Sequence, residues 1–205
     1  MRFVSIPGIS AIIYPKAIKS FPLAKGKLFL SFDDGPEPSV TPRILDILKD
    51  FNAKATFFCL GEKVAHHIEL FNQIISEGHS IGNHGYYHLN GFKVSSKNYI
   101  ENVEQANSLI HSILFRPPYG KMKLGQYYSL QQHYKVILWN VMSYDFDEKL
   151  SGADCAKIVV KYTTPGSIIV FHDNVKAGPR VIKALPMVLD YFIKSGFCFE
   201  GIPVF

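Results

Sequence analysis

Short apolar runs alternate along the chain with longer segments in which apolar residues recur at helical spacing. The runs are nearly unbroken, as is typical of strands covered on both faces, and they span residues 27–32, 54–60, 79–84, 135–140 and 167–172. The segments at helical spacing span residues 41–51, 64–78, 96–113, 151–162 and 179–194. This alternation predicts a parallel sheet with outer helices, either open or closed as a barrel.

Two of the helical segments allow closer predictions. In segment 41–51, Thr41 is a candidate N-cap and Pro42 suits the first turn. The apolar residues that follow share one face: Ile44, Leu45, Ile47, Leu48 and Phe51. His66 and His67 fall in the middle of the next helical segment with no carboxylate in view, so we interpret them as structural.

The composition is that of a globular chain of one domain. With 205 residues, 47% of them hydrophobic and 19% charged, the chain can bury a core and is too apolar to be disordered. The net charge of +5 does not indicate nucleic-acid binding, because the lysines are scattered and no basic run with interleaved aromatics occurs. The three cysteines form no CxxC pair, and Cys59 lies in an apolar run, as a buried free thiol would.

The first 26 residues form an apolar segment ahead of the first strand. Between Arg2 and Lys16 the residues are uncharged but interrupted by two prolines and a glycine. A membrane-spanning helix needs about 20 apolar residues, so no transmembrane segment is expected. The segment lacks the clean cleavage site that would mark a signal peptide. We therefore expect a cytoplasmic or membrane-associated location. We expect residues 1–26 to pack on a domain of residues 27–205, with shallow membrane contact as the alternative.

Polar side chains gather where the predicted strands end. They are Asp33 and Asp34 after strand 27–32, His84 after strand 79–83, Arg116 at the break 115–120, and His172 after strand 167–171. The carboxyl ends of parallel strands meet at one face of an α/β fold, and such folds build their sites there. Scattered surface residues would not follow this order, so we interpret the set as a functional site.

The chemistry of this set indicates a metal site. His84 and His88 are four residues apart in a glycine-containing segment that is expected to be a loop. Two imidazoles and one carboxylate are a common catalytic zinc set, with the fourth position left for water or substrate. One of two adjacent aspartates then binds the cation while the other stays ionised as a base. His172 is the candidate acid, and Arg116 can hold the base through paired hydrogen bonds.

Four short motifs stand in order along the chain: SFDDGP (31–36), HGYYH (84–88), RPPYG (116–120) and VFH (170–172). With them the chain resembles the polysaccharide deacetylases of carbohydrate esterase family four, the NodB-homology domain, and within it a bacterial subgroup without an obvious secretion signal. The resemblance implies a catalytic domain at 27–205, folded as a single distorted parallel (β/α) barrel of about seven strands. It implies metal-dependent hydrolysis of N-acetyl groups from N-acetylglucosamine-type glycans, such as peptidoglycan or chitin-like oligomers, with release of acetate.

The resemblance also implies roles for single residues. The catalytic residues would be Asp33 as general base, His172 as general acid and Arg116 as the group that orients the base. The metal ligands would be Asp34, His84 and His88, with Zn2+ the expected ion and Co2+ or others possible. The substrate contacts would be Tyr119, whose backbone N–H would stabilise the oxyanion, and Phe146.

The fourth family motif, D-x-x-D-W, is altered in this chain. It falls on MSYDF (142–146), where Met142 replaces the first aspartate, Asp145 matches the second, and Phe146 replaces the tryptophan. The resemblance implies that the first aspartate partners the acid histidine. We therefore expect either a lower pH optimum than in relatives or a substitute carboxylate near His172. Phe146 keeps an aromatic side chain, which would face a sugar or pack in the core.

Two other functions stay open at this point. A related metal-dependent hydrolase of a non-sugar amide or a lipid-linked sugar would need the same metal residues. A catalytically weak carbohydrate-binding protein would keep the fold with a decayed acid, but it would have no need of a base beside a metal. Turnover that requires Asp33 would distinguish an enzyme from a binder. The expected partner is an N-acetylated glycan, and the expected state is a monomer.

Overall fold

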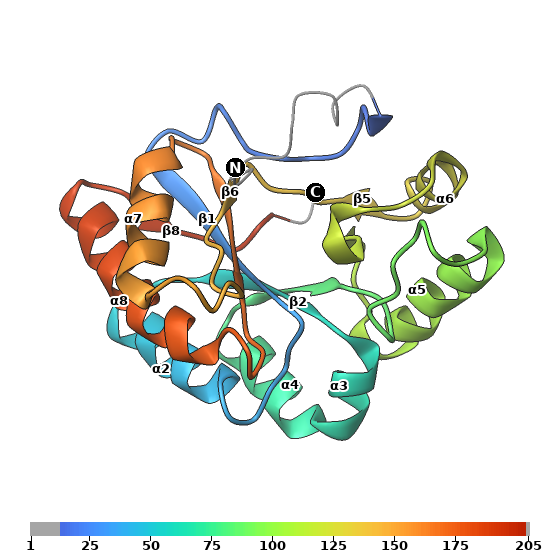
Figure 1. Cartoon of the computed structure of the whole chain (residues 1–205), viewed down its shortest axis with the longest axis horizontal. Helices are drawn as coiled ribbons and strands as arrows, with labels where there is room; N and C mark the ends of the chain where they lie inside the picture. Colours follow the sequence, from blue (N-terminus) through green and yellow to red (C-terminus); the bar gives the residue numbers. More distant parts are fainter. Residues whose placement is uncertain (1–12, 204–205) are drawn as a thin grey trace.

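The computed structural model describes residues 13–203, in which a parallel sheet curls into a partial barrel with helices around it (Figure 1). The strands are β1 Lys27–Asp33, β2 Ala55–Cys59, β3 Ser80–Asn83, β4 Leu114–Phe115, β5 Lys135–Val136, β6 Val141–Met142, β7 Ile168–His172 and β8 Cys198–Phe199. Seven of them follow the order β5–β4–β3–β2–β1–β7–β6, and β8 pairs with β1 off this path. All of these described strand pairs are parallel. The predicted distorted barrel is confirmed.

Helices cover the outer face of the sheet. They are α2 Thr41–Asp50, α3 Gly61–His66, α4 Ile68–Ser76, α5 Ser96–Ile110, α6 Leu124–Leu130, α7 Gly152–Tyr162 and α8 Gly178–Lys194, with a 3₁₀ turn η1 at Pro118–Gly120. Figure 1 shows α7 and α8 side by side on one flank of the sheet, and α3 and α4 on another. None of the helices in residues 13–203 combines the length and the apolar character that crossing a bilayer requires.

Side chains of β1 alternate between two layers of the core, as the period of two in a strand requires. Leu28, Leu30 and Phe32 belong to the outer layer, which packs against the helices. Phe29 belongs to the inner layer, together with Phe58, Ile168, Val170 and Ile202. The same alternation turns Ser31 and Asp33 inward. The barrel therefore has an apolar interior that becomes polar where β1 ends.

The register of the strands brings their carboxyl ends together. Asp33 pairs with His172 of β7 on one side and with Phe58 of β2 on the other. On the next strands, Cys59 pairs with Asn83, and Asn83 pairs with Phe115. The residues that follow these positions are Asp34, His84 and Arg116, so one end of the barrel collects the polar side chains that the sequence places after its strands.

The described part of the N-terminal segment, residues 13–26, contacts the sheet both beside β5 and beside β7. Ile18 forms a parallel bridge with Ile137, beyond β5, and Ser20 forms an antiparallel bridge with Ser167, just before β7. Figure 1 shows this blue segment crossing one end of the barrel before it enters β1. Residues 1–12 lie outside the described residues. The division at 26/27 and the single domain 27–205 stay predictions.

Three of the predictions about individual elements were wrong, and neither α6 nor β4 was predicted. The helix predicted at 64–78 is two helices, because the backbone leaves the helical region at His67 (φ −134°, ψ 48°). His66 and His67 are therefore at a break and not in the middle of a helix. Val40 and not Thr41 is the N-cap of α2, since the Thr41 side chain is directed to Asp173. The strand predicted at 135–140 is short, and β6 follows it separately.

Candidate active site

Asp33 is held by a buried arginine at the mouth of the barrel. Arg116 follows β4 and is fully buried, while Asp33 is 4% exposed. The guanidinium donates hydrogen bonds of 2.7 Å to Oδ1 of Asp33 and 2.7 Å to the Ser31 hydroxyl. It also donates to the carbonyls of residues 137 and 138 and lies 4.0 Å above the Phe58 ring. These contacts on every side fix the arginine, and the arginine fixes the orientation of the carboxylate.

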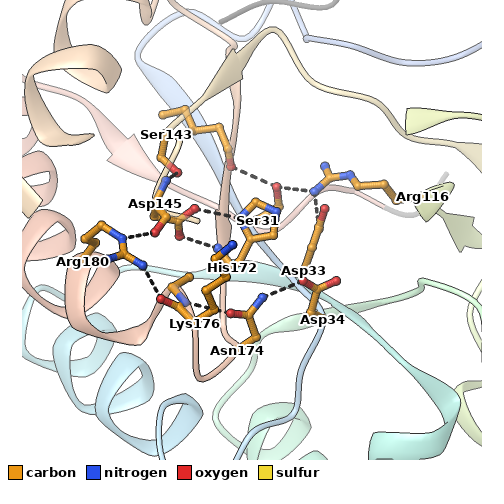
Figure 2. A network of polar contacts seen from close by, with 12 residues as sticks. Ser31, Asp33, Asp34, Arg116, Ser143, Asp145, His172, Asn174, Lys176 and Arg180 are labelled. Carbon is orange, nitrogen blue, oxygen red and sulfur yellow. Dashed lines mark hydrogen bonds and ion pairs between the residues drawn. The ribbon is translucent and has the colours of Figure 1, made fainter. Parts of the chain in front are cut away.

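Asp34, His84 and His88 converge beside this pair. One nitrogen of each histidine and one oxygen of Asp34 lie within 4.8 Å of one another. Oδ1 of Asp34 is 3.5 Å from Nε2 of His84 and 3.2 Å from Nε2 of His88. The other oxygen, Oδ2, accepts a 2.7 Å hydrogen bond from the side-chain amide of Asn174, which Figure 2 shows reaching toward Asp34.

The contacts of these three residues fit a divalent cation. Nδ1 of His84 is 2.8 Å from the Arg116 carbonyl, so it carries the proton, and a neutral His84 has its lone pair on Nε2. That lone pair faces Oδ1 of Asp34, a buried atom with no hydrogen-bond partner among the described residues. Burial and the neighbouring His84 lower the pKa of His88 to about 4, so the His88 ring is neutral at pH 7. Electron pairs that point at one another in this way are stabilised by a cation between them.

His172 lies on the other side of Asp33 and is paired with Asp145 (Figure 2). Its Nδ1 is 2.7 Å from Oδ1 of Asp145, and its backbone N–H donates a 2.7 Å hydrogen bond to Oδ2. Burial would lower the pKa of His172, but the charge and hydrogen bond of Asp145, together with Asp34 and Asp33, raise it to about 10. The imidazole is therefore protonated at neutral pH.

One open cleft of about 850 Å³ is lined by Asp33, Asp34, His84, His88 and His172. Its walls carry aromatic side chains, namely Tyr119, Trp139, Tyr144 and Phe146. The Tyr119 ring packs edge-on to His88 at 4.5 Å, and the Phe146 ring packs edge-on to His172 at 5.3 Å. Tyr119 and Phe146, the two residues predicted to contact substrate, thus adjoin a candidate metal ligand and the candidate acid.

Comparison with known proteins agrees with this geometry. The family model described as polysaccharide deacetylase matches residues 22–133. A peptidoglycan-N-acetylglucosamine deacetylase of Bacillus cereus is 30% identical over 180 residues, which are 84% of this chain and 84% of that protein. The chain belongs to the polysaccharide deacetylase family.

Other relatives extend the comparison within the polysaccharide deacetylases. A second Bacillus cereus protein of the same description is 35% identical over 162 residues, 76% of this chain, and the chain spans 58% of its length. A crystal structure of a peptidoglycan N-acetylglucosamine deacetylase in complex with a substituted benzamide superposes with a TM-score of 0.86. That match has 32% identity and covers 97% of this chain and 95% of the other.

The altered fourth motif of this polysaccharide deacetylase does not leave His172 without a carboxylate. The expected substitute is present, and it is Asp145, the second aspartate position of the motif. The backbone at Tyr144 has φ 60°, a left-handed turn that brings Asp145 back to His172. Met142 lines the cleft and packs against the inner apolar layer.

The cleft residues Trp139 and Tyr144 were not predicted, and neither were two polar residues that hold Arg116 and Asp34. Ser31 accepts from Arg116, and its position two residues before Asp33 on the same strand face was the available signal. Asn174 binds Asp34, and its position two residues beyond His172 gave a weaker signal because the chain turns there. The predicted residues themselves all reach the site, whether as part of the cleft lining or, for Arg116, behind it.

Proposed function

We propose that the protein is a metal-dependent hydrolase that removes N-acetyl groups from N-acetylglucosamine-type glycans and releases acetate. The observation that carries this proposal is the arrangement around Asp33. A buried arginine orients this carboxylate, a cation-binding set lies on one side of it, and a protonated histidine lies on the other. Amide hydrolysis needs a base, an electrophile and an acid at one carbonyl group, and this arrangement supplies all three.

Asp34, His84 and His88 would hold the cation, with Zn2+ as the expected ion. A cation at this position would polarise the acetyl carbonyl and lower the pKa of a water molecule. Asp33 takes a proton from the attacking water, whose oxygen forms the new bond to the acetyl carbon. Arg116 keeps Asp33 aimed at the cleft, because its guanidinium donates a 2.7 Å hydrogen bond to Oδ1.

His172 completes the reaction on the leaving group. The developing negative charge on the acetyl oxygen would be stabilised by a cation held by Asp34, His84 and His88, and the backbone N–H of Tyr119 donates to the same oxygen. His172 gives its proton to the amide nitrogen as the carbon–nitrogen bond breaks, which leaves a free amine on the sugar and acetate. Asp33 then loses its proton to solvent, and His172 regains one. The carboxylate of Asp145 keeps the ring in the orientation and the protonation state that this transfer needs.

The shape of the cleft favours a sugar over a small non-sugar amide. Its aromatic walls suit the flat apolar faces of sugar rings, and the Tyr119 side chain is 57% exposed at the opening. Relatives described as peptidoglycan N-acetylglucosamine deacetylases resemble this chain along most of its length. We therefore infer that a glycan strand with N-acetylglucosamine units is the substrate.

Acetate release tests this function. Zinc-loaded parent protein and Asp33→Asn are compared on N-acetylglucosamine oligomers and on peptidoglycan. Acetate from the parent, reduced about 10²-fold or more in Asp33→Asn, is expected because the base is lost while the fold is kept. Equal acetate from both proteins would exclude Asp33 as the base.

A binding measurement separates an enzyme from a carbohydrate-binding relative. A binder releases no acetate and holds the glycan equally well with Asp33 or Asn at this position. If the parent protein neither releases acetate nor binds any of these glycans, both the glycan deacetylase and the carbohydrate binder are excluded. A non-sugar amide would then be favoured as the substrate.

A further inference from the structure

The charged side chains of the cleft are sorted by depth. The two acids, Asp33 and Asp34, lie at the bottom, with side chains 6% and 18% exposed. Asp33 is paired with Arg116, and Asp34 belongs to the cation-binding set. The protonated candidate acid His172 also lies deep, with a side chain 14% exposed and paired with Asp145. The charged lining residues that remain are Lys121 and Lys176, and both are exposed. A ligand that enters the cleft therefore meets positive charge first.

Lys121 stands on a fixed piece of backbone. Its N–H donates a 3.1 Å hydrogen bond to the Pro118 carbonyl. Gly120, just before it, packs so closely on Trp139 that an added Cβ would lie 2.8 Å from the indole. Met122, just after it, is clamped by the Tyr14 hydroxyl, which donates to the Met122 carbonyl at 2.5 Å and accepts from its N–H at 3.2 Å. In the described part of the chain, no acidic side chain pairs with the Lys121 ammonium.

Lys176 is tied to the metal residues on the opposite wall. It lies two residues beyond Asn174, whose amide binds Asp34 and whose side-chain oxygen accepts the Ala177 N–H at 2.8 Å. The Lys176 carbonyl accepts from the Arg180 guanidinium. Its ammonium is 3.9 Å from Glu148, with side chains 59% and 72% exposed, and such an open pair contributes little. The lysine is therefore available to an anion in the cleft.

The two lysines flank the candidate metal site. In the sheet order, β4 and β7 lie on either side of β3, β2 and β1, and the cation-binding residues follow β1 and β3. Lys121 follows β4 and Lys176 follows β7. Figure 2 agrees with this order, because Lys176 and Arg116, the residue after β4, lie on opposite sides of Asp33 and Asp34.

We propose that Lys121 and Lys176 form two anion subsites that bind carboxylate groups on the sugars before and after the one that is deacetylated. This inference rests on the proposed function and specifies its substrate as an acidic glycan strand. A single sugar on a diphosphate lipid carrier would present negative charge on one side only, and a neutral chitin-like strand would present none. Cations on both sides of the reacting position match a strand that carries carboxylates on alternate sugars.

The test uses matched acidic and neutral strands. The acidic probe is a peptidoglycan glycan strand freed of its stem peptides, which carries a carboxylate on every second sugar. The neutral probes are the same strand with its carboxylates converted to methylamides and an N-acetylglucosamine oligomer of equal length. Zinc-loaded parent, Lys121→Gln, Lys176→Gln and the double variant are compared by KM and kcat for acetate release. Lys97→Gln removes an exposed lysine on α5 and serves as the control.

Each lysine variant is expected to raise KM for the acidic strand about two- to fivefold, with kcat unchanged, because an exposed ion pair contributes up to about that factor. KM for both neutral probes should stay the same. Salt should raise KM for the acidic strand with the parent and not with the double variant, since salt screens exposed charges. Lys121→Arg and Lys176→Arg should restore the parent values. An unchanged KM for the acidic strand, or an equal rise on the neutral probes, would overturn the proposal.

Direct binding separates failure of the subsites from failure of the proposed activity. Calorimetric titration of the acidic strand into parent and double variant needs no turnover. Salt-sensitive binding that the double variant loses would support the subsites even where the parent releases no acetate. Acetate release with identical binding of acidic and amidated strands would support the activity and overturn the subsites. No binding and no acetate would overturn both.

Discussion

Asp145 holds His172 by both its ring and its backbone. Oδ1 lies 2.7 Å from Nδ1 of the ring, and Oδ2 accepts the backbone N–H at 2.7 Å. The carboxylate is fully buried, and its own backbone is held by the Ser143 hydroxyl and by Arg180. A single aspartate thus sets the position, the ring orientation and the charge of the candidate acid. A second aspartate at position 142 is therefore not needed for that role.

Asp145→Asn should move the alkaline limb of the pH–rate profile to lower pH. His172 has its pKa raised to about 10, so in the parent it stays protonated and active well above neutral pH. Without the Asp145 charge, burial acts on the imidazole with less opposition, and its pKa falls by about one to three units. Activity that requires the protonated ring is then lost as pH rises through this lower value. The measurement is kcat from pH 5 to 10.

Glu148→Gln is the matched control for this experiment. It removes the same charge from the same loop, and its side chain is exposed and paired with Lys176 rather than with His172. Its alkaline limb should coincide with that of the parent. An Asp145→Asn profile that also coincides with the parent would show that His172 is not the acid or that Asp145 does not set its pKa.

Met142→Asp should not raise activity. Nδ1 of His172 is already bound by Asp145, so a carboxylate at position 142 could not take over this contact. Met142 also packs against the inner apolar layer, where an added charge costs stability. We expect kcat equal to or below that of the parent, with an unfolding midpoint that is lower. A rise in kcat of about tenfold or more would mean that the motif's first aspartate has a role that Asp145 does not fill.

Arg116→Met should abolish activity and destabilise the fold. It leaves the Asp33 carboxylate buried without its 2.7 Å partner, and breaking a buried ion pair in this way costs about 3–5 kcal/mol. Combining it with Asp33→Asn removes the unpaired charge, so the double variant should recover part of the unfolding free energy and none of the activity. Urea denaturation and acetate release measure the two effects. A double variant as unstable as the sum of the single variants would mean that the pair is not coupled.

The strands and the polar residues at their ends could be predicted because both depend on local pattern. The apolar run of β1 is continuous, since both of its faces are covered, and Asp33 directly follows it. The partner of His172 could not be predicted in the same way. Spacing alone does not show that the chain reverses at Tyr144, with φ 60°, and returns Asp145 to β7.

One helix break and several contacts between distant segments could not be predicted from the sequence either. The break at His67 leaves the apolar spacing of the two helices almost continuous, so periodicity predicted a single helix. Arg116 was predicted to bind one aspartate, but its stacking on Phe58 and its bond to Ser31 depend on the curvature of the sheet. Such contacts follow from how strands pack across the barrel and leave no signal in the neighbouring residues.

His88→Ala should remove most of the zinc affinity. His88 contributes one of three donor atoms that converge within 4.8 Å, and losing one of three protein ligands weakens the site by about 10²-fold or more. Competition with a chromophoric chelator measures the dissociation constant. His133→Ala, an exposed histidine, is the control and should bind zinc like the parent. A stoichiometric, tight zinc site that survives His88→Ala would place the metal elsewhere.

Gly35→Ala should displace Asp34, the candidate metal ligand that directly precedes it in the sequence. A Cβ at this position would lie 1.9 Å from Oδ2 of Asp173, a buried carboxyl group that accepts a 2.8 Å hydrogen bond from Thr41. Either the Asp173 side chain or the turn that carries Asp34 must shift, so we expect a loss of about 1–3 kcal/mol in unfolding free energy together with weaker zinc binding.

Adding Asp173→Ala opens the space, so the double variant should be more stable than the sum of its single variants. Gly125→Ala, where an added Cβ meets nothing within 4 Å, is the control and should leave both quantities unchanged or slightly improved. Full zinc affinity in Gly35→Ala would show that the turn accommodates the methyl group without moving Asp34, and that its contact with Asp173 does not position the metal site.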